Sequence, residues 1–202
     1  FEQKISQLDT DTDLILLPEM FSTGFTMKPS SVAETMKGAT VIWMINMAKV
    51  HDVAIVGSIV VLENNKYFNR AIFVHPSGDL EIYDKRHLFS LAGEHRQYTS
   101  GNTRIVINFK GWRICPLICY DLRFPEIFRL QHDHNVQVIV LPAAFTEQTG
   151  KVHWETLVKA RAIENLCYVV TACQDGYHIS GTRKHGNSMI VNPWGQIMSR
   201  ID

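Results

Sequence analysis

The chain has 202 residues, of which 46% are hydrophobic and 20% charged, and this composition suits one compact domain with a sizeable core. Lys and Arg together number 20, as do Asp and Glu, and neither sign forms a block, so neither nucleic acid nor an anionic membrane surface is indicated as a partner. No apolar run approaches the ~20 residues of a membrane-spanning helix and no signal peptide is visible, so we expect a cytoplasmic protein.

The first part of the chain alternates helical and extended patterns. Apolar side chains at helical spacing predict helices over residues 1–8 and 38–50. Short apolar runs, bounded by polar turns, predict strands over residues 13–17, 53–62, 67–74 and 80–85.

The middle of the chain contains a long segment, residues 86–103, with no clean periodicity. Loops of this length inside compact domains are usually functional or disordered. A hairpin follows, with strands over 104–109 and 112–118 around a Lys110-Gly111 turn, and it ends at Cys119.

In the last part, a short helix opens at Phe124-Pro125. The remaining elements are a strand over 136–141, a helix over 153–165, a strand over 166–172, and two segments, 188–192 and 196–201, around a turn. Several strands are apolar nearly throughout, as strands covered on both faces should be. We therefore expect an α/β fold in which packed sheets carry helices outside.

The four cysteines, Cys115, Cys119, Cys167 and Cys173, fit neither a zinc ribbon nor a dense disulfide framework. On one extended strand the Cα atoms of Cys115 and Cys119 would lie about 13 Å apart, too far for a disulfide or a shared metal. We expect Cys115, Cys167 and Cys173 to be small buried hydrophobic residues.

Nine histidines raise the alternative of a metal site, but His132 and His134 stand on a polar loop and are expected at the surface. The sequence has no Gly-x-Ser-x-Gly motif, no glycine-rich phosphate loop and no His-Glu-x-x-His zinc helix. We expect neither a metal nor a cofactor.

Three side chains with complementary chemistry each follow a predicted apolar strand: Glu19, Lys85 and Cys119. Strand ends collect active sites in α/β proteins because the loops there converge over a rigid scaffold. Each residue taken singly is explained more simply as a solvated side chain, so it is the combination that indicates a site.

The chemistry of these residues fits together. A cysteine acts as a nucleophile through its thiolate, which a nearby cation stabilises and a nearby base generates. Glu19 can take the thiol proton and later return one to departing ammonia. Lys85 can lower the pKa of Cys119 and donate to the oxyanion of the tetrahedral intermediate, with the backbone N–H of Tyr120 as a second donor. The pattern predicts hydrolysis of an amide through a cysteine thioester.

Three segments around these residues resemble the signature segments of the nitrilase (carbon–nitrogen hydrolase) superfamily, in the same order: 16–21 (LLPEMF), 83–89 (YDKRHLF) and 118–126 (ICYDLRFPE). The helix over 153–165 and the segment 185–195 resemble later parts of the family pattern, so the resemblance covers nearly the whole chain. It implies a nitrilase-like α-β-β-α sandwich, usually paired into a four-layer dimer, that hydrolyses nonpeptide C–N bonds.

The resemblance also implies roles for individual residues. The catalytic Glu, Lys and Cys of the family fall on Glu19, Lys85 and Cys119. Many members use a second glutamate in the loop after the lysine. Here the candidate is Glu94, and the alternative is a solvated loop carboxylate.

Three further residues lie where family members shape the substrate pocket, and we expect them to bind substrate: Tyr120, Ala144 and Phe145. Arg123 is a further substrate-binding candidate, although its place just past Cys119, close to Glu126, favours a structural ion pair over a substrate contact.

Relative to the family pattern, the chain begins within the first helix, without the opening strand, and stops before the C-terminal segment. We therefore expect residues 1–202 to be one carbon–nitrogen hydrolase domain, truncated at both ends. Up to about residue 129 the chain resembles the omega-amidase branch, which acts on 2-oxo acid amides, and residues 141–195 resemble the deaminated glutathione amidase branch.

Both branches favour a small-molecule amide with a free carboxylate, for which a bidentate arginine is the best geometric match. Arg96, Arg123 and Arg183 are the nearest candidates in sequence. We expect 2-oxo acid amides such as 2-oxoglutaramate as substrates. The alternatives are deaminated glutathione and a catalytically impaired binding or scaffold protein on the same fold.

A homodimer or larger homo-oligomer is expected from the resemblance. The helix over 153–165, with Trp154, Leu157 and Ile163, and the segment after Cys119 are the expected contact surfaces.

Overall fold

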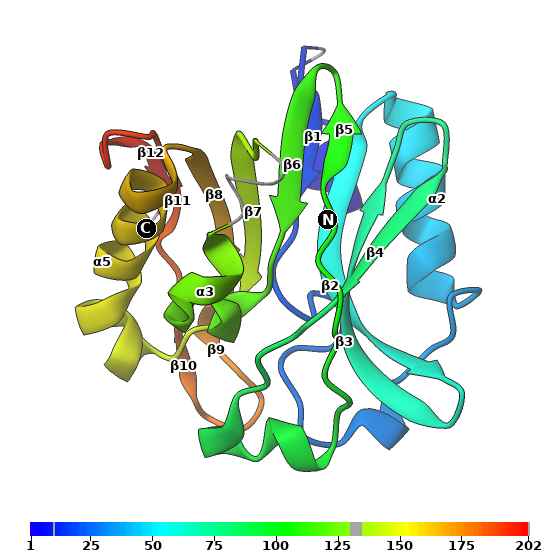
Figure 1. The fold of residues 1–202 in the computed structure, drawn as a ribbon. Coiled ribbons are helices and arrows are strands. Elements are labelled where there is room, and N and C mark those ends of the chain that lie inside the picture. Colours follow the sequence, from blue (N-terminus) through cyan, green and yellow to red (C-terminus); the bar gives the residue numbers. More distant parts are fainter. Residues whose placement is uncertain (10, 130–134, 202) are drawn as a thin grey trace.

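Two β-sheets form the centre of the computed structural model, which describes residues 1–9, 11–129 and 135–201 (Figure 1). The first sheet has the strand order β1-β2-β3-β4, with β1 parallel to β2 and the other neighbours antiparallel. Its strands are β1 (Leu14–Leu16), β2 (Ala54–Glu63), β3 (Lys66–Val74) and β4 (Leu80–Asp84).

The second sheet has the order β12-β11-β8-β7-β6-β5, in which β6, β7 and β8 run parallel. Its strands are β5 (Ile107–Phe109), β6 (Trp112–Pro116), β7 (Val138–Ala143), β8 (Tyr168–Cys173), β11 (Ser188–Val191) and β12 (Ile197–Ile201). A separate hairpin, β9 (Asp175–Tyr177) and β10 (Arg183–His185), connects β8 to β11.

Helices cover the outer faces of the two sheets. α2 (Ala39–His51) packs on the first sheet, and α3 (Pro125–Phe128) and α5 (Glu147–Asn165) pack on the second (Figure 1). The other helical pieces are short: α1 (Glu2–Ile5) and the 3₁₀ turns η1 (Pro29–Ser31), η2 (Ser90–Ala92), η3 (Glu94–Arg96) and η4 (Cys119–Arg123). The expected single-domain α-β-β-α sandwich is confirmed.

The layering explains why β2 is apolar along nearly its whole length. Successive side chains of a strand point to opposite faces, and here both faces are covered. Ile55, Ile59 and Val61 pack with α2, whereas Ala54 and Val56 pack in the layer between the two sheets. A strand in this position has no solvent-facing side along most of its length.

Two segments differ from the sequence prediction. The helix predicted to begin at residue 153 begins at Glu147. Gly150 weakens the helical pattern there, but a Cβ at this position would overlap the ring of His185, so the close approach of α5 to β10 requires a glycine. The segment 86–103 contains η2 and η3, separated by Gly93 at a φ of +82°.

The expectation that Trp154 belongs to a subunit surface is wrong. Trp154 is fully buried, its ring packs on Phe145, and its Nε1 donates to the carbonyl of Asn187 at 2.8 Å. It therefore holds α5 onto its own sheet. His132 and His134 lie outside the described residues. Among the described residues, none belongs to a helix long and apolar enough to cross a membrane.

Candidate active site

Glu19 follows β1 in a segment whose backbone is held from several sides. The Glu19 N–H donates to the carbonyl of Ala143 at 3.4 Å, and its own carbonyl accepts from Nε2 of Gln174 at 2.6 Å. The next N–H, that of Met20, donates to Oγ of Ser58 at 2.9 Å. These bonds join the ends of both sheets and fix the fully buried Glu19 side chain.

Lys85 and Glu94 complete a buried ion cluster with Glu19. Lys85 Nζ lies 2.7 Å from Glu19 Oε1 and 3.0 Å from Glu94 Oε2. The amide of Asn69, in the middle of β3, donates to Glu19 Oε1 at 2.8 Å and to Glu94 Oε1 at 3.1 Å. The N–H of Phe89 donates to the other oxygen of Glu94 at 2.5 Å. Glu94 is therefore no solvated loop carboxylate.

The cluster keeps Lys85 charged despite complete burial. Burial opposes the ammonium form. The charges of Glu19 and Glu94 outweigh it and raise the pKa of Lys85 above its ordinary value. Two carboxylates around one ammonium leave the cluster with an excess of negative charge when all three are ionised.

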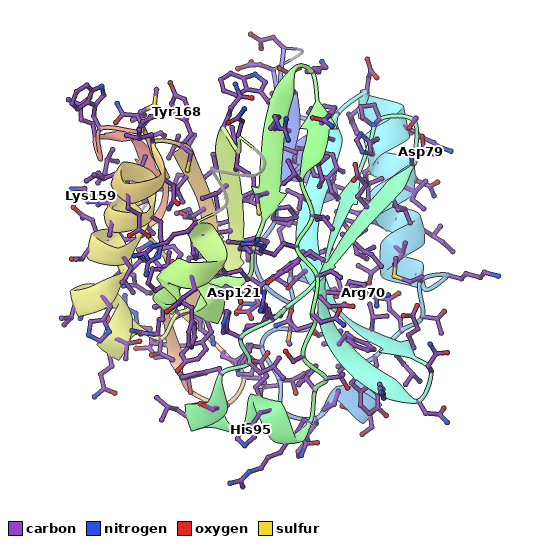
Figure 2. All side chains as sticks on the ribbon, viewed as in Figure 1. Arg70, Asp79, His95, Asp121, Lys159 and Tyr168 are labelled. Carbon is purple, nitrogen blue, oxygen red and sulfur yellow. The ribbon has the colours of Figure 1, made fainter. Side chains whose placement is uncertain are left out.

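Cys119 begins the 3₁₀ turn η4, three positions after the end of β6, at a φ of +42° that residues other than glycine rarely adopt. The fully buried Asp121 closes this turn. Its Oδ2 accepts from the Ile118 N–H at 2.9 Å and from the Tyr83 hydroxyl at 2.7 Å. In Figure 2, Asp121 lies near the centre of the molecule beside α3. It links the turn that carries Cys119 to β4, the strand that leads to Lys85.

Lys85 lowers the pKa of the Cys119 thiol, as expected, but it does not make the thiol acidic in this state of the site. Burial and the negative charge of Glu19 raise the pKa of the thiol well above its ordinary value, although Lys85 and a backbone hydrogen bond from Ala144 lower it. Burial, followed by the charge of Glu19, outweighs the effect of Lys85 on the thiol pKa.

One carboxylate oxygen of Glu19 remains free. Oε1 accepts from both Lys85 and Asn69, whereas the buried Oε2 has no hydrogen-bond partner in the described part of the chain. Glu19 also interacts with the Cys119 thiol strongly enough to raise its pKa. A buried acceptor without a partner, next to a protonated thiol, is a suitable proton acceptor.

A cavity of about 530 Å³ opens onto Cys119, Glu19 and Lys85. The residues expected to bind substrate all line it: Tyr120, Arg123, Ala144 and Phe145. Glu94 does not line the cavity and reaches it only through Lys85.

The three candidate arginines differ in whether they line the cavity. Arg123 lines the cavity, where its guanidinium lies 5.3 Å from the centre of the Phe145 ring and 3.2 Å from Nδ1 of His153. The alternative ion pair with Glu126 is not formed. Neither Arg96 nor Arg183 lines the cavity, and Arg183 pairs instead with Glu147 at 3.3 Å.

Three residues of the site were not found from the sequence: Asn69, Gln174 and Lys184. Asn69 carried only a weak local signal, because it is one of two adjacent polar residues, with Arg70, inside a strand that is otherwise apolar after Lys66. Gln174 and Lys184 carried none, since Gln174 lies between β8 and β9 and the strand of Lys184, β10, has only three residues. No group of three or more His, Cys, Asp or Glu side chains in the described ranges could hold a metal ion.

Alkylation by iodoacetamide should distinguish Cys119 from the other thiols. Cys115, Cys167 and Cys173 are buried, and burial raises the pKa of each to about 12, so they should stay unlabelled in the folded protein. Cys119 should label first because it lines the cavity. Below its raised pKa the thiolate fraction grows about tenfold per pH unit. Its rate, followed by mass spectrometry, should still be rising at pH 9, and a plateau below pH 8 would contradict the raised pKa.

A family model for carbon-nitrogen hydrolases matches residues 2–202. The omega-amidase YafV of Escherichia coli is 38% identical over 193 residues, which cover 96% of this chain and 74% of that protein. The deaminated glutathione amidase of Synechocystis is 38% identical over 152 residues, which cover 68% of this chain and 54% of that protein. XC1258 from Xanthomonas campestris, a CN-hydrolase superfamily protein solved with an arsenic adduct in the active site, has a TM-score of 0.94 at 35% identity and covers 99% of this chain and 77% of its own. The chain belongs to the carbon–nitrogen hydrolase family.

Proposed function

We propose that this protein hydrolyses the C–N bond of a small carboxylate-bearing amide, with Cys119 as nucleophile, Glu19 as general base and acid, and Lys85 as oxyanion donor. The observation that best supports these roles is the buried, unpartnered Oε2 of Glu19 beside a thiol that burial keeps protonated. The family and its amidase members support the reaction class.

In the first half of the reaction, the Cys119 sulfur attacks the amide carbon while the thiol proton moves to Oε2 of Glu19. The carbonyl oxygen becomes an oxyanion, and Lys85 Nζ and the backbone N–H of Tyr120 donate to it. The tetrahedral intermediate then breaks its C–N bond, and the proton held by Glu19 leaves with the nitrogen as ammonia. A thioester on Cys119 remains.

In the second half, water attacks the thioester carbon and gives a proton to Glu19. The C–S bond breaks, the carboxylic acid leaves, and the proton returns to the sulfur. Glu94 contacts Lys85 and not the cavity, so its role is to orient and charge Lys85. Both halves of the reaction therefore use the same base, Glu19, and the same cation, Lys85, and both are held in position before the substrate binds.

The substrate class follows from the charges on the cavity wall. Besides Lys85, the cavity is lined by three cations, Lys28, Arg123 and Lys184, and by no carboxylate other than Glu19 among the described residues. Such a wall favours an amide with an anionic group. The similarity to an omega-amidase over nearly the whole chain supports 2-oxo acid amides such as 2-oxoglutaramate.

Deaminated glutathione is the second candidate, because a deaminated glutathione amidase shares 38% identity with 68% of this chain. A third possibility is a protein of the same fold that binds or scaffolds without turnover. It differs from both amidases in releasing no ammonia from any ω-amide.

Substitutions at the three proposed catalytic residues should abolish or strongly reduce ammonia release. Cys119→Ala should remove essentially all turnover, because no other group can form the thioester. Lys85→Ala and Glu19→Gln should each lower kcat/KM by at least ~10²-fold, the scale of a lost oxyanion donor or general base.

Matched controls separate these roles from damage to the fold. Cys167→Ala removes a buried thiol away from the cavity, and Glu126→Gln neutralises an exposed carboxylate. Both should keep most of the activity. Retention of most activity by any of the three site variants would show that the assigned roles are wrong.

A comparison of kcat/KM for 2-oxoglutaramate and deaminated glutathione decides between the two substrates. We expect the smaller amide to be preferred. A preference of tenfold or more for deaminated glutathione, about 1.4 kcal/mol in transition-state free energy, would overturn this assignment.

We also propose that the chain forms a homodimer or larger homo-oligomer through the outer side of α5. Val152 and Ile163 are both at least half exposed and lie about three helical turns apart, so they share one side of the helix. Leu166, directly after α5, is 72% exposed. Light scattering at micromolar concentration should give at least twice the chain mass of 23.1 kDa, and a clean monomer mass would count against the proposal.

A further inference from the structure

Lys184 differs from every other buried cation in the described part of the chain. Four Lys or Arg residues are buried there: Arg70, Lys85, Arg161 and Lys184. The first three each pair with at least one carboxylate. Lys184 is only 5% exposed, and no carboxylate pairs with it among the described residues. A buried charge without a counter-ion is costly to the folded state.

The surroundings of the Lys184 ammonium leave room for an anion. Its Nζ donates to the carbonyl of Ala144 at 3.2 Å and lies 5.2 Å from the centre of the Phe25 ring. An ammonium has three N–H donors, and one neutral carbonyl satisfies one of them. The same side chain lines the cavity that opens onto Cys119.

The position of Lys184 is fixed relative to the nucleophile. The backbone of Ala144 makes a hydrogen bond with Cys119, and the Ala144 carbonyl accepts one from Lys184. One residue therefore contacts both side chains. The backbone of β10 is tied to the same segment, because the His185 N–H donates to the Phe145 carbonyl at 2.9 Å. The Phe25 ring centre lies 5.5 Å from Lys85 Nζ as well, so both ammonium groups border one ring.

We propose that Lys184 is the specificity-determining cation of this site and that it binds the free carboxylate of a short acidic ω-amide whose amide carbon lies at Cys119. This proposal rests on the proposed amidase function and assigns the residue that recognises its substrate. Arg123 is a weaker candidate, because its guanidinium already contacts His153 and the Phe145 ring and is partly open to solvent. A carboxylate at the buried Lys184 would gain a charge-assisted hydrogen bond with little screening by water.

A matched substrate pair tests the proposal. Glutaramate and pentanamide have the same chain length and the same amide, but only glutaramate carries a carboxylate. The parent enzyme should favour glutaramate in kcat/KM. Lys184→Met should reduce the glutaramate-to-pentanamide ratio by about ten- to hundredfold, the range for a lost hydrogen bond between charged groups. Lys184→Arg should retain more of the preference than Lys184→Met does.

Lys28→Met is the matched control, because Lys28 lines the same cavity but is exposed to solvent. It should change the ratio less than Lys184→Met. Lys184→Met should also melt at or above the temperature of the parent, since it removes a buried unpaired charge. An unchanged ratio, or equal losses on both amides together with a lower melting temperature, would overturn the proposal.

Binding measurements keep this test separate from that of the proposed function. Calorimetry should detect glutaramate binding to Cys119→Ala, and adding Lys184→Met should raise Kd at least tenfold. Equal affinity with and without Lys184 would reject its role whether or not the parent turns over. Ammonia release from neither amide, together with Lys184-dependent binding, would reject the amidase function and retain the anion site.

Discussion

The interaction on which the site depends is the buried ammonium of Lys85 between the carboxylates of Glu19 and Glu94. Moving each ion out of water costs several kcal/mol, and only close pairing with further hydrogen bonds offsets that cost. Glu19, Lys85 and Glu94 come from three separate segments, after β1, after β4 and in η3, so the cluster forms only when the first sheet and the loop 86–103 are in place. The bond from the Glu19 N–H to the Ala143 carbonyl in β7 ties the cluster to the second sheet. Asn69, in the middle of β3, donates to both carboxylates and keeps them from turning away. The geometry of the site is thus set by the whole fold.

The sequence allowed prediction of those residues whose importance shows in the pattern of their own segment. Glu19, Lys85 and Cys119 could be found because each follows an apolar strand, and Glu94 because its loop resembles that of a known family. Gln174 and Lys184 could not, since their importance lies in contacts between distant positions. Gln174 donates to the carbonyl of a residue 155 positions away, and Lys184 to that of Ala144 across the cavity wall. The layers of the sandwich were predictable from strands that are apolar on both faces. The start of α5 was not predictable, because Gly150 is required by the close approach of His185 in β10 and not by the helix itself.

A sequence pattern reports a residue's chemistry and not its surroundings, which explains both the wrong prediction for Trp154 and the raised pKa of Cys119. Trp154 is apolar and lies on a helix, which fits a subunit surface as well as a core. Its indole N–H has a carbonyl partner inside the chain, and this contact fixes it in the core. An ammonium such as that of Lys85, taken alone, lowers the pKa of the Cys119 thiol. Burial and the charge of Glu19 raise that pKa well above its ordinary value. Pairwise electrostatic reasoning fails in a buried cluster because every member acts on every other one at low dielectric.

The raised thiol pKa has a consequence for how such a site selects its substrate. A standing thiolate on Cys119 would place a second negative charge next to that of Glu19, whereas a neutral thiol avoids this until the proton can move to Oε2 of Glu19. Lys184 and Arg123 are further cations on the wall of the same cavity. Under the proposed function, an acidic amide has one favourable orientation, with its carboxylate at one of these cations and its amide at Cys119. Under this proposal, the surroundings that keep the Cys119 thiol protonated and the cations on the cavity wall together direct which end of an acidic amide meets the sulfur.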